Sequence, residues 1–194
     1  MRFYFLMLLR AYTFLGLIGL VSMSQSVQAQ DSYDHSFVHE VSVGYQVGGS
    51  GNTYFFTYNS ALQMALSTGK NIAENVLLAG RVGIENNKEG TIYPLAIQLK
   101  KSFGKNAKQF LQLHTGYSYG SSSNTNTNYK YRGGALAGLS YGLDLAKIGG
   151  NKIFASLGYH LRRSKVIYKP FDSSAQVITP IDNHFLGLDI GFQF

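Results

Sequence analysis

Apolar and polar residues alternate with a period of two along most of this chain, most clearly in the last ten residues. One face of this segment carries the apolar residues Leu186, Leu188, Ile190, Phe192 and Phe194. The other face consists of Phe185, Gly187, Asp189, Gly191 and Gln193. Because successive side chains of a β-strand point to opposite faces, the pattern predicts a strand with one unbroken apolar face. A face of this length can cross a bilayer in a tilted strand.

Seven earlier segments alternate in the same way, and helical spacing fits none of them as well. They cover residues 38–47, 54–66, 76–86, 91–103, 109–119, 129–144 and 152–168. Turn-like connections separate the segments at 48–53, 67–75, 87–90, 104–108, 120–128, 145–151 and 169–182. The whole pattern predicts an all-β chain, an eight-stranded antiparallel up-and-down transmembrane β-barrel. An even number of strands places both termini on one side, which in outer-membrane barrels is the periplasm.

The alternation alone leaves the polarity of the barrel open, because a secreted lipocalin-like ligand binder alternates too, with its apolar face inside. The terminal Phe194 and a polar face rich in Gly, Ser and Gln favour the membrane barrel. Tyrosines at the outward strand ends favour it as well, since aromatic girdles mark membrane interfaces. The predicted outward girdle consists of Tyr45, Tyr54, Tyr93, Tyr117, Tyr119, Tyr129 and Tyr131, and Phe103, Phe192 and Phe194 mark the opposite rim.

Composition supports a single β domain. The 194 residues include 22 Gly, 14 Tyr and 13 Phe, and only 14% are charged, against about 25% in ordinary soluble domains. The formal net charge is +7 and the isoelectric point is near 9.5. The basic residues form no arm, helix face or known nucleic-acid motif, so no nucleic-acid partner is expected.

The first 29 residues have the composition of a secretory signal peptide. Arg2 and Arg10 supply the positive flank, residues 11–21 the apolar stretch, and 27–29 a small-x-Ala cleavage pattern. The alternative is an uncleaved membrane helix, which needs about 20 apolar residues. We expect a signal peptide at 1–29, a short periplasmic arm at 30–36 and a barrel at 37–194. With no cysteine, disulfides and thiolate chemistry are excluded, and no cofactor is predicted.

The sequence resembles small bacterial outer-membrane β-barrel proteins, the porin-like "outer membrane protein beta-barrel" domain family. The resemblance rests on the signal peptide, on the segment 92–99 leading through Phe103-Gly104 into 110–119, and on the ending 187–194. It implies that the terminal aromatic residues Phe192 and Phe194 belong to the signal read by the barrel-insertion machinery. It implies the fold for residues 37–194 but no particular activity.

The polar face of the strands carries equal numbers of acidic and basic residues. In an eight-stranded barrel, whose interior its own side chains fill, unpaired charges would be costly. We therefore expect a paired network that plugs the lumen and fixes the register, with a narrow path for small solutes or protons as the alternative. Its predicted members are Glu40, Arg81, Glu85, Lys100, Arg132, Asp144, Arg162 and Asp189.

The residues do not favour catalysis or a metal. No His-x-Ser pair occurs on a lipid-facing strand, which a lipid deacylase of this size would need for its nucleophile and base. The connection 169–182 with His184 offers only common loop residues. The N-terminal residues Asp31, Asp34, His35 and His39 match no metal-ligand spacing and read as a polar arm. We therefore predict no catalytic, cofactor-binding or metal-binding residues.

These observations predict a non-enzymatic integral outer-membrane protein with a structural or surface-interaction role in the Gram-negative cell envelope. A solute channel, a lipid-modifying enzyme and the lipocalin-like binder remain alternatives. The expected partners are outer-membrane lipid, lipopolysaccharide, and the insertion machinery with periplasmic chaperones during biogenesis. Arg163, Lys165 and Lys169 at the outward rim are candidates for contact with lipopolysaccharide phosphates, with an ordinary cationic rim as the alternative.

Overall fold

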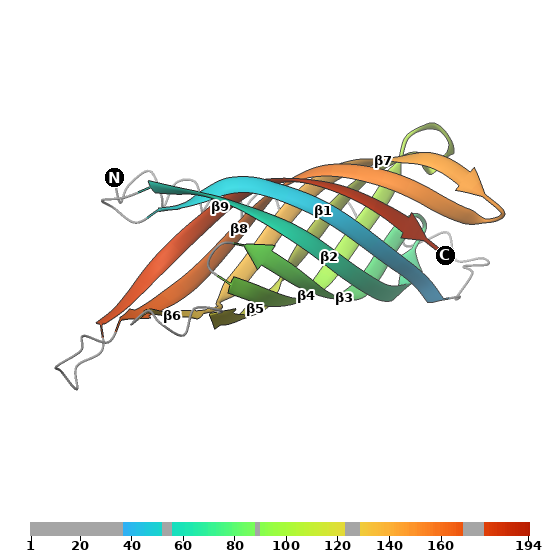
Figure 1. Ribbon diagram of the computed structural model, residues 1–194. Helices are drawn as coiled ribbons and strands as arrows, with labels where there is room; N and C mark the ends of the chain where they lie inside the picture. The colour runs from blue at the N-terminus through green and yellow to red at the C-terminus, as the bar shows by residue number, and fades with distance from the viewer. Residues whose placement is uncertain (1–36, 52–55, 88–89, 123–128, 169–176) are drawn as a thin grey trace, which may run out of the picture. The chain divides into compact units, whose positions relative to one another are not determined.

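The computed structural model describes residues 37–51, 56–87, 90–122, 129–168 and 177–194. The predicted signal peptide (1–29) and N-terminal arm (30–36) lie outside the described residues, as do Tyr54 and Lys169. Nine strands and one short helical turn make up the described chain (Figure 1). They are β1 (Phe37–Gly51), β2 (Phe56–Ala73), β3 (Val76–Asn87), β4 (Gly90–Phe103), η1 (Lys105–Ala107), β5 (Gln109–Ser122), β6 (Tyr129–Arg132), β7 (Ala135–Ile148), β8 (Asn151–Tyr168) and β9 (Val177–Gln193).

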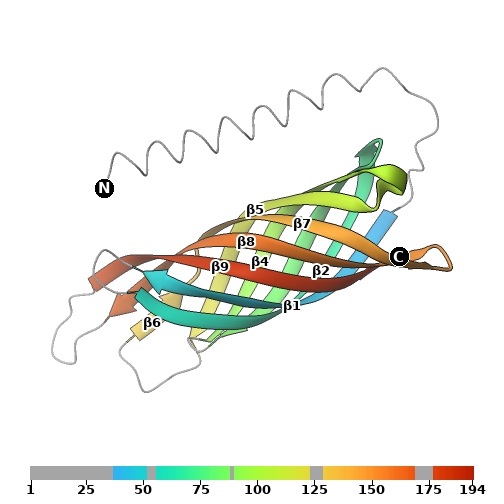
Figure 2. The ribbon, with the colours of Figure 1, turned by 90° about the horizontal axis from the view of Figure 1, so that it is seen from above.

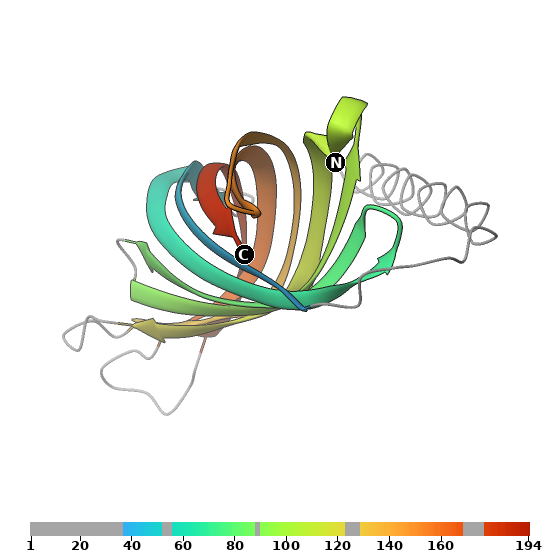
Figure 3. The same cartoon turned by 90° about the vertical axis from the view of Figure 1, so that its right-hand side faces the viewer.

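The strands form one closed antiparallel ring of eight. Each strand pairs with its neighbours along the chain, and β9 closes the ring by pairing with both β8 and β1. The short β6 pairs with β8 just beyond β7, so β6 and β7 occupy one position in the ring. Figures 2 and 3 show the strands curving around a common axis. The predicted eight-stranded up-and-down barrel is confirmed.

The stagger of the ring follows from the strand registers. From Glu40 the paired residues lead around the barrel to Ser50, ten residues further along β1. The intermediate positions are Ser67, Arg81, Ala96, Gly116, Leu136, Arg162 and Asn183. A shear of this size tilts the strands by roughly 35–45° from the barrel axis. The interior of such a barrel is just wide enough for side chains to fill.

A β-bulge at Gly133 and Gly134 separates β6 from β7. Arg132 pairs with Lys165, and Leu136 pairs with Arg162. The chain therefore advances four residues from Arg132 to Leu136 while β8 advances only three. One extra residue reverses the face on which preceding side chains lie. The prediction that Arg132 belongs to the lumen is wrong for this reason, and its side chain is exposed.

Two connections are shorter than the sequence predicts. β2 continues to Ala73 through residues that were expected to form a turn, and a tight turn at Glu74-Asn75 follows, with Asn75 at φ 58°. Gly149 and Gly150, both with positive φ, join β7 to β8, as tight hairpin turns require. Polar residues such as Ser67 are typical of turns, which is why the sequence pattern placed them in a connection. They are equally compatible with a strand whose inner face is polar.

The two faces of the barrel have opposite polarity. Leu62 and Leu157 on the outer face are 61% and 62% exposed, whereas Gln98 and Arg162 inside are 0% and 4% exposed. Large apolar side chains lie exposed around the ring, whereas soluble monomers rarely expose a contiguous apolar patch larger than a few hundred Å². This arrangement is the reverse of a lipocalin-type barrel. Among the described residues, no helix is long and apolar enough to span a membrane.

The bulge gives a first test, because a Cβ on Gly133 would overlap the carbonyl oxygen of Ser118. We expect Gly133→Ala to lower the free energy of unfolding by about 1–3 kcal/mol, the usual cost of overpacking. Gly80→Ala is the matched control, since the nearest atom to its Cβ would be 4.0 Å away. Urea titration of the refolded barrel measures both, and equal midpoints would contradict the need for glycine at the bulge.

Candidate functional site

The interior of the barrel holds most of the charged residues that the sequence placed there. Asp144 is half-buried at the strand end and pairs with Lys152 at 3.0 Å, and Arg132 is exposed because of the bulge. The buried members are Glu40, Arg81, Glu85, Lys100, Arg162 and Asp189. Three acidic and three basic side chains thus share the interior, so it carries no large net charge when all are ionised.

The group nearest the start of β1 and the end of β9 contains an ion pair enclosed by aromatic rings. Lys100 Nζ lies 2.5 Å from Glu40 Oε1 and also donates to Gln193 Oε1 at 3.3 Å. The same ammonium lies 4.2 Å from the ring centroid of Phe110 and 4.5 Å from that of Phe154. The two rings pack edge to face with centroids 5.6 Å apart. A cation–π contact of this kind is stronger when desolvated, as it is here.

Gln98 connects this ion pair to the middle of the barrel. Its Nε2 donates to Glu40 Oε2 at 2.8 Å. Its Oε1 accepts from Ser67 Oγ at 3.1 Å and from an Arg81 NH1 at 3.3 Å. An amide both donates and accepts, so Gln98 bonds to the Glu40 carboxylate and to the Arg81 guanidinium at the same time. An ionised carboxylate in its place could accept from Arg81 but could not donate to Glu40.

A second amide chain lies beside the last strand. Gln46 Nε2 donates to Gln63 Oε1 at 2.6 Å, and Gln63 Nε2 donates to Asp189 Oδ1. Asp189 occupies the space above Gly44, where any Cβ would overlap its carboxylate. The glycine on β1 therefore makes room for the acid on β9.

Two histidines meet in the middle of the lumen. His160 Nδ1 and His114 Nε2 are 3.3 Å apart, and their ring centroids 5.1 Å apart. Gly138, on the strand between them, leaves the space that both rings use. His114 Nδ1 and His160 Nε2 have no hydrogen-bond partner among the described residues. This pairing was missed because the sequence shows only that each histidine faces inward.

The group at the other end is built around Arg162. Its NH2 forms an ion pair with Glu85 Oε2, and its guanidinium carbon lies 5.6 Å from the Phe185 ring centroid. Within the described part of the chain, Arg162 Nε and NH1 have no partner. Asn183 completes this level by donating to Ser164 Oγ at 3.2 Å.

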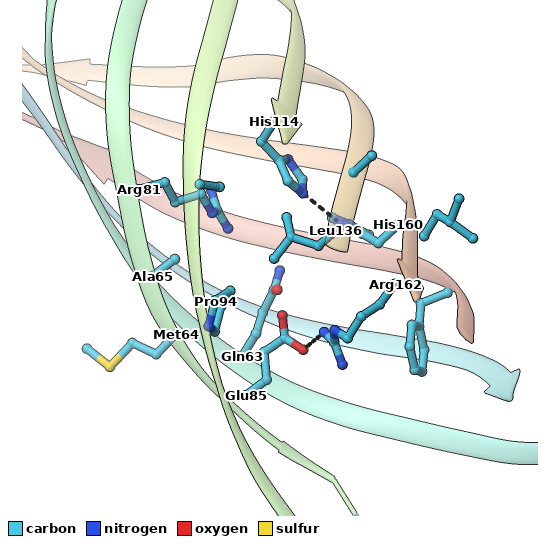
Figure 4. Close-up of a pocket in the computed structure, with 14 residues that line it drawn as sticks. Gln63, Met64, Ala65, Arg81, Glu85, Pro94, His114, Leu136, His160 and Arg162 are labelled. Carbon is cyan, nitrogen blue, oxygen red and sulfur yellow. Dashed lines mark hydrogen bonds and ion pairs between the residues drawn. The ribbon is translucent and has the colours of Figure 1, made fainter. Parts of the chain in front are cut away.

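A small cavity lies between these groups. Its volume of about 20 Å³ is enough for about one water molecule. Figure 4 shows the lining side chains, with the His114–His160 and Glu85–Arg162 contacts dashed. An ordered water there could satisfy some of the unpartnered nitrogens, as buried waters commonly do.

The outer surface carries the remaining predicted residues. Tyr45, Tyr93, Tyr117 and Tyr119 are exposed. Tyr54 and the side chains of Tyr129 and Tyr131 lie outside the described part. Phe192 and Phe194 are exposed at the opposite rim with ring centroids 5.9 Å apart.

Of the candidate lipopolysaccharide residues, Arg163 and Lys165 lie toward the C-terminal end of β8. Arg163, with a 61% exposed side chain, pairs with Asp182 at 3.1 Å, and Lys165 is exposed. Nearby on the same face, the Tyr159 hydroxyl and His184 Nδ1 share a hydrogen bond. The sequence did not single out this pair, which only the register of β8 against β9 brings together.

No metal-binding group stands out in the described ranges, where no three His, Asp or Glu side chains gather closely enough to hold an ion. Asp31, Asp34 and His35 lie outside the described residues. His39 is stacked on Phe194, with ring centroids 5.6 Å apart, and its Nδ1 lies 3.2 Å from Thr68 Oγ1. The two histidines inside the barrel, His114 and His160, contact each other.

The buried ion pair gives the second test. Glu85→Ala leaves the Arg162 charge buried without its partner, and we expect a loss of about 3–5 kcal/mol in the free energy of unfolding. The double variant Glu85→Ala/Arg162→Met should recover much of this loss. Asp182→Ala, which removes the exposed partner of Arg163, should cost at most about 1 kcal/mol. Urea titrations compare the three, and equal losses for both single variants would refute the buried role.

Solved structures with a similar fold are outer-membrane proteins. The solid-state NMR structure of outer membrane protein AlkL in DMPC lipid bilayers gives a TM-score of 0.51 at 10% identity, covering 87% of this chain and 94% of AlkL. Neisserial surface protein A (NspA) gives 0.46 at 10% identity, covering 79% of this chain and 95% of NspA. OprG from Pseudomonas aeruginosa gives 0.45 at 12% identity, covering 84% of this chain and 98% of OprG. No protein-family model matches the sequence, and no curated protein is significantly similar to it. The chain has the fold of the small eight-stranded outer-membrane barrels.

Proposed function

We propose that this protein is an integral outer-membrane barrel whose lumen is closed by its own side chains. It serves a structural or surface-interaction role in the envelope rather than catalysis. The observation that carries the proposal is the inverted polarity of the barrel, with apolar residues outside and ion pairs inside. A hydrocarbon surround is the environment in which this distribution is favourable.

Several features support a location in the outer membrane. The exposed apolar side chains surround the ring, and aromatic residues lie at both rims. Residues 1–29 act in this proposal as the signal peptide, and 30–36 as a short arm in the periplasm. The insertion machinery reads Phe192 and Phe194, and lipid and lipopolysaccharide surround the mature barrel. Both termini then face the periplasm, and the connections after β1, β3, β5 and β8 face outward.

A closed lumen is supported by the contacts that cross it. Glu40 on β1 reaches Lys100 on β4, and Glu85 on β3 reaches Arg162 on β8. Such pairs bridge the walls of the barrel, and Gln98 connects Glu40 to Arg81. Gln63 links Gln46 to Asp189 in a second polar chain. The cavity left among them holds about 20 Å³, which is too small for a hydrated solute. A solute channel would require the two ion pairs to separate.

The first experiment tests the embedded barrel. Outer-membrane fractions and a refolded mature chain are run on SDS gels with and without boiling. We expect the unboiled protein to migrate faster, because a closed barrel resists SDS until it is heated. A soluble periplasmic protein without a mobility shift would refute the proposal.

The second experiment tests the closed lumen in planar bilayers. We expect no sustained single-channel steps from the wild type. The variant Glu40→Ala/Lys100→Ala/Glu85→Ala/Arg162→Ala removes two charge-balanced pairs and should conduct. Arg163→Ala/Asp182→Ala removes an exposed pair and should behave as the wild type does. Steady wild-type steps as large as those of the four-residue variant would show a channel instead.

A further inference from the structure

Lysines collect at the end of the barrel where β1 begins and β9 ends. Lys70 pairs with Phe37 at the start of β1, Lys101 lies opposite Val76 at the start of β3, and Lys108 precedes β5. Lys147 and Lys152 pair with each other beside the β7–β8 turn. Together these five residues are called the lysine collar.

Few acidic groups balance the lysine collar. In the described chain around it, Glu74 and Asp144 are the acidic side chains. Asp144 already pairs with Lys152, and Lys101 Nζ donates to the main-chain oxygen of Glu74 at 3.2 Å rather than to its carboxylate. Lys70, Lys108 and Lys147 are exposed. Within the part of the chain that the structure describes, the lysine collar therefore has more positive than negative charge.

Apolar side chains alternate with these lysines. Phe37, Ile72, Leu145 and Ile148 are all exposed, the last two by 60% and 61%. Lys70 Nζ lies 4.4 Å from the Phe37 ring centroid. An apolar stem with a cationic tip is the arrangement that lysine adopts at a membrane interface.

The β7–β8 hairpin extends this mixed surface. Pairing of β7 with β5 ends at Leu143, and pairing of β8 with β9 ends at Lys152. Residues 145–151 therefore reach beyond both neighbouring strands, as Figures 1 and 2 show. Residues 145–150 are exposed throughout. A soluble environment alone does not favour Leu145 and Ile148 at such a tip.

We propose that the lysine collar binds anionic phospholipid headgroups of the leaflet at this end of the barrel. The inference rests on the proposed membrane barrel. Lysine ammonium groups would meet lipid phosphates, while Leu145, Ile148 and Ile72 enter the interfacial layer. Charge complementarity favours an anionic lipid over a zwitterionic one, because three exposed cations of the collar have no acidic partner among the described residues.

The test uses the full mature chain in vesicles of phosphatidylcholine alone and in vesicles that also contain phosphatidylglycerol. We expect phosphatidylglycerol to raise the urea midpoint of unfolding, and added salt to reduce that rise because it screens surface charge. Lys108→Gln/Lys147→Gln should lose most of the rise. Arg132→Gln/Lys165→Gln removes two exposed cations at the other end and should retain it.

The outcomes separate this inference from the proposed function. If the wild type has the same urea midpoint in both kinds of vesicle, the lysine collar does not bind anionic lipid, and the proposed membrane barrel is unaffected. If both double variants lose the rise in midpoint equally, the inference also fails, because any exposed cation would then contribute to lipid binding. If the unboiled protein from neither kind of vesicle migrates faster than the boiled protein on SDS gels, the proposed membrane barrel is wrong. Both leaflets of these vesicles have the same composition, so the direction of insertion does not affect the comparison.

Discussion

In the membrane location that we propose, the structure depends on one constraint: a strand in hydrocarbon must satisfy every backbone N–H and C=O within the protein. The pairing of β9 with both β8 and β1 meets this constraint, because it leaves the sheet without an open edge through the apolar zone. Once the ring is closed, strand alternation divides the side chains into a lipid face and a lumen face. Closure and alternation produce the two faces, and the residues at the alternate positions make the outer face apolar and the inner face polar.

The polar and charged side chains of the interior must then find their partners within the barrel. Eight strands with a ten-residue stagger enclose little space, so each large polar side chain requires a small neighbour. Gly44 accommodates Asp189, and Gly138 accommodates the two imidazoles. Amides carry the connections between charges, because they donate at one atom and accept at the other. The same narrowness explains why glycine lies opposite these large side chains.

The sequence predicted the strand number, the closure and the inward face because period-two alternation is a local property. Glu40, Arg81, Glu85, Lys100, Arg162 and Asp189 were all placed on the face that proves to be buried. Arg132 was misplaced by a one-residue bulge, which no pattern of hydrophobicity reveals. Partners across the lumen, such as Gln98 with Glu40, depend on the shear, and the shear is a property of the whole ring.

That shear makes the barrel a system of discrete registers. A slip of one residue between two strands would turn one strand's polar face to the lipid, so misassembly can proceed only by steps of two. A two-residue slip would bring Gln98 or Ser102 to the place of Lys100 and leave Glu40 buried without a counter-ion. The Glu40–Lys100 pair, modest as a source of stability, therefore distinguishes the native register from a slip of two residues, which the alternation of polar and apolar positions alone would allow.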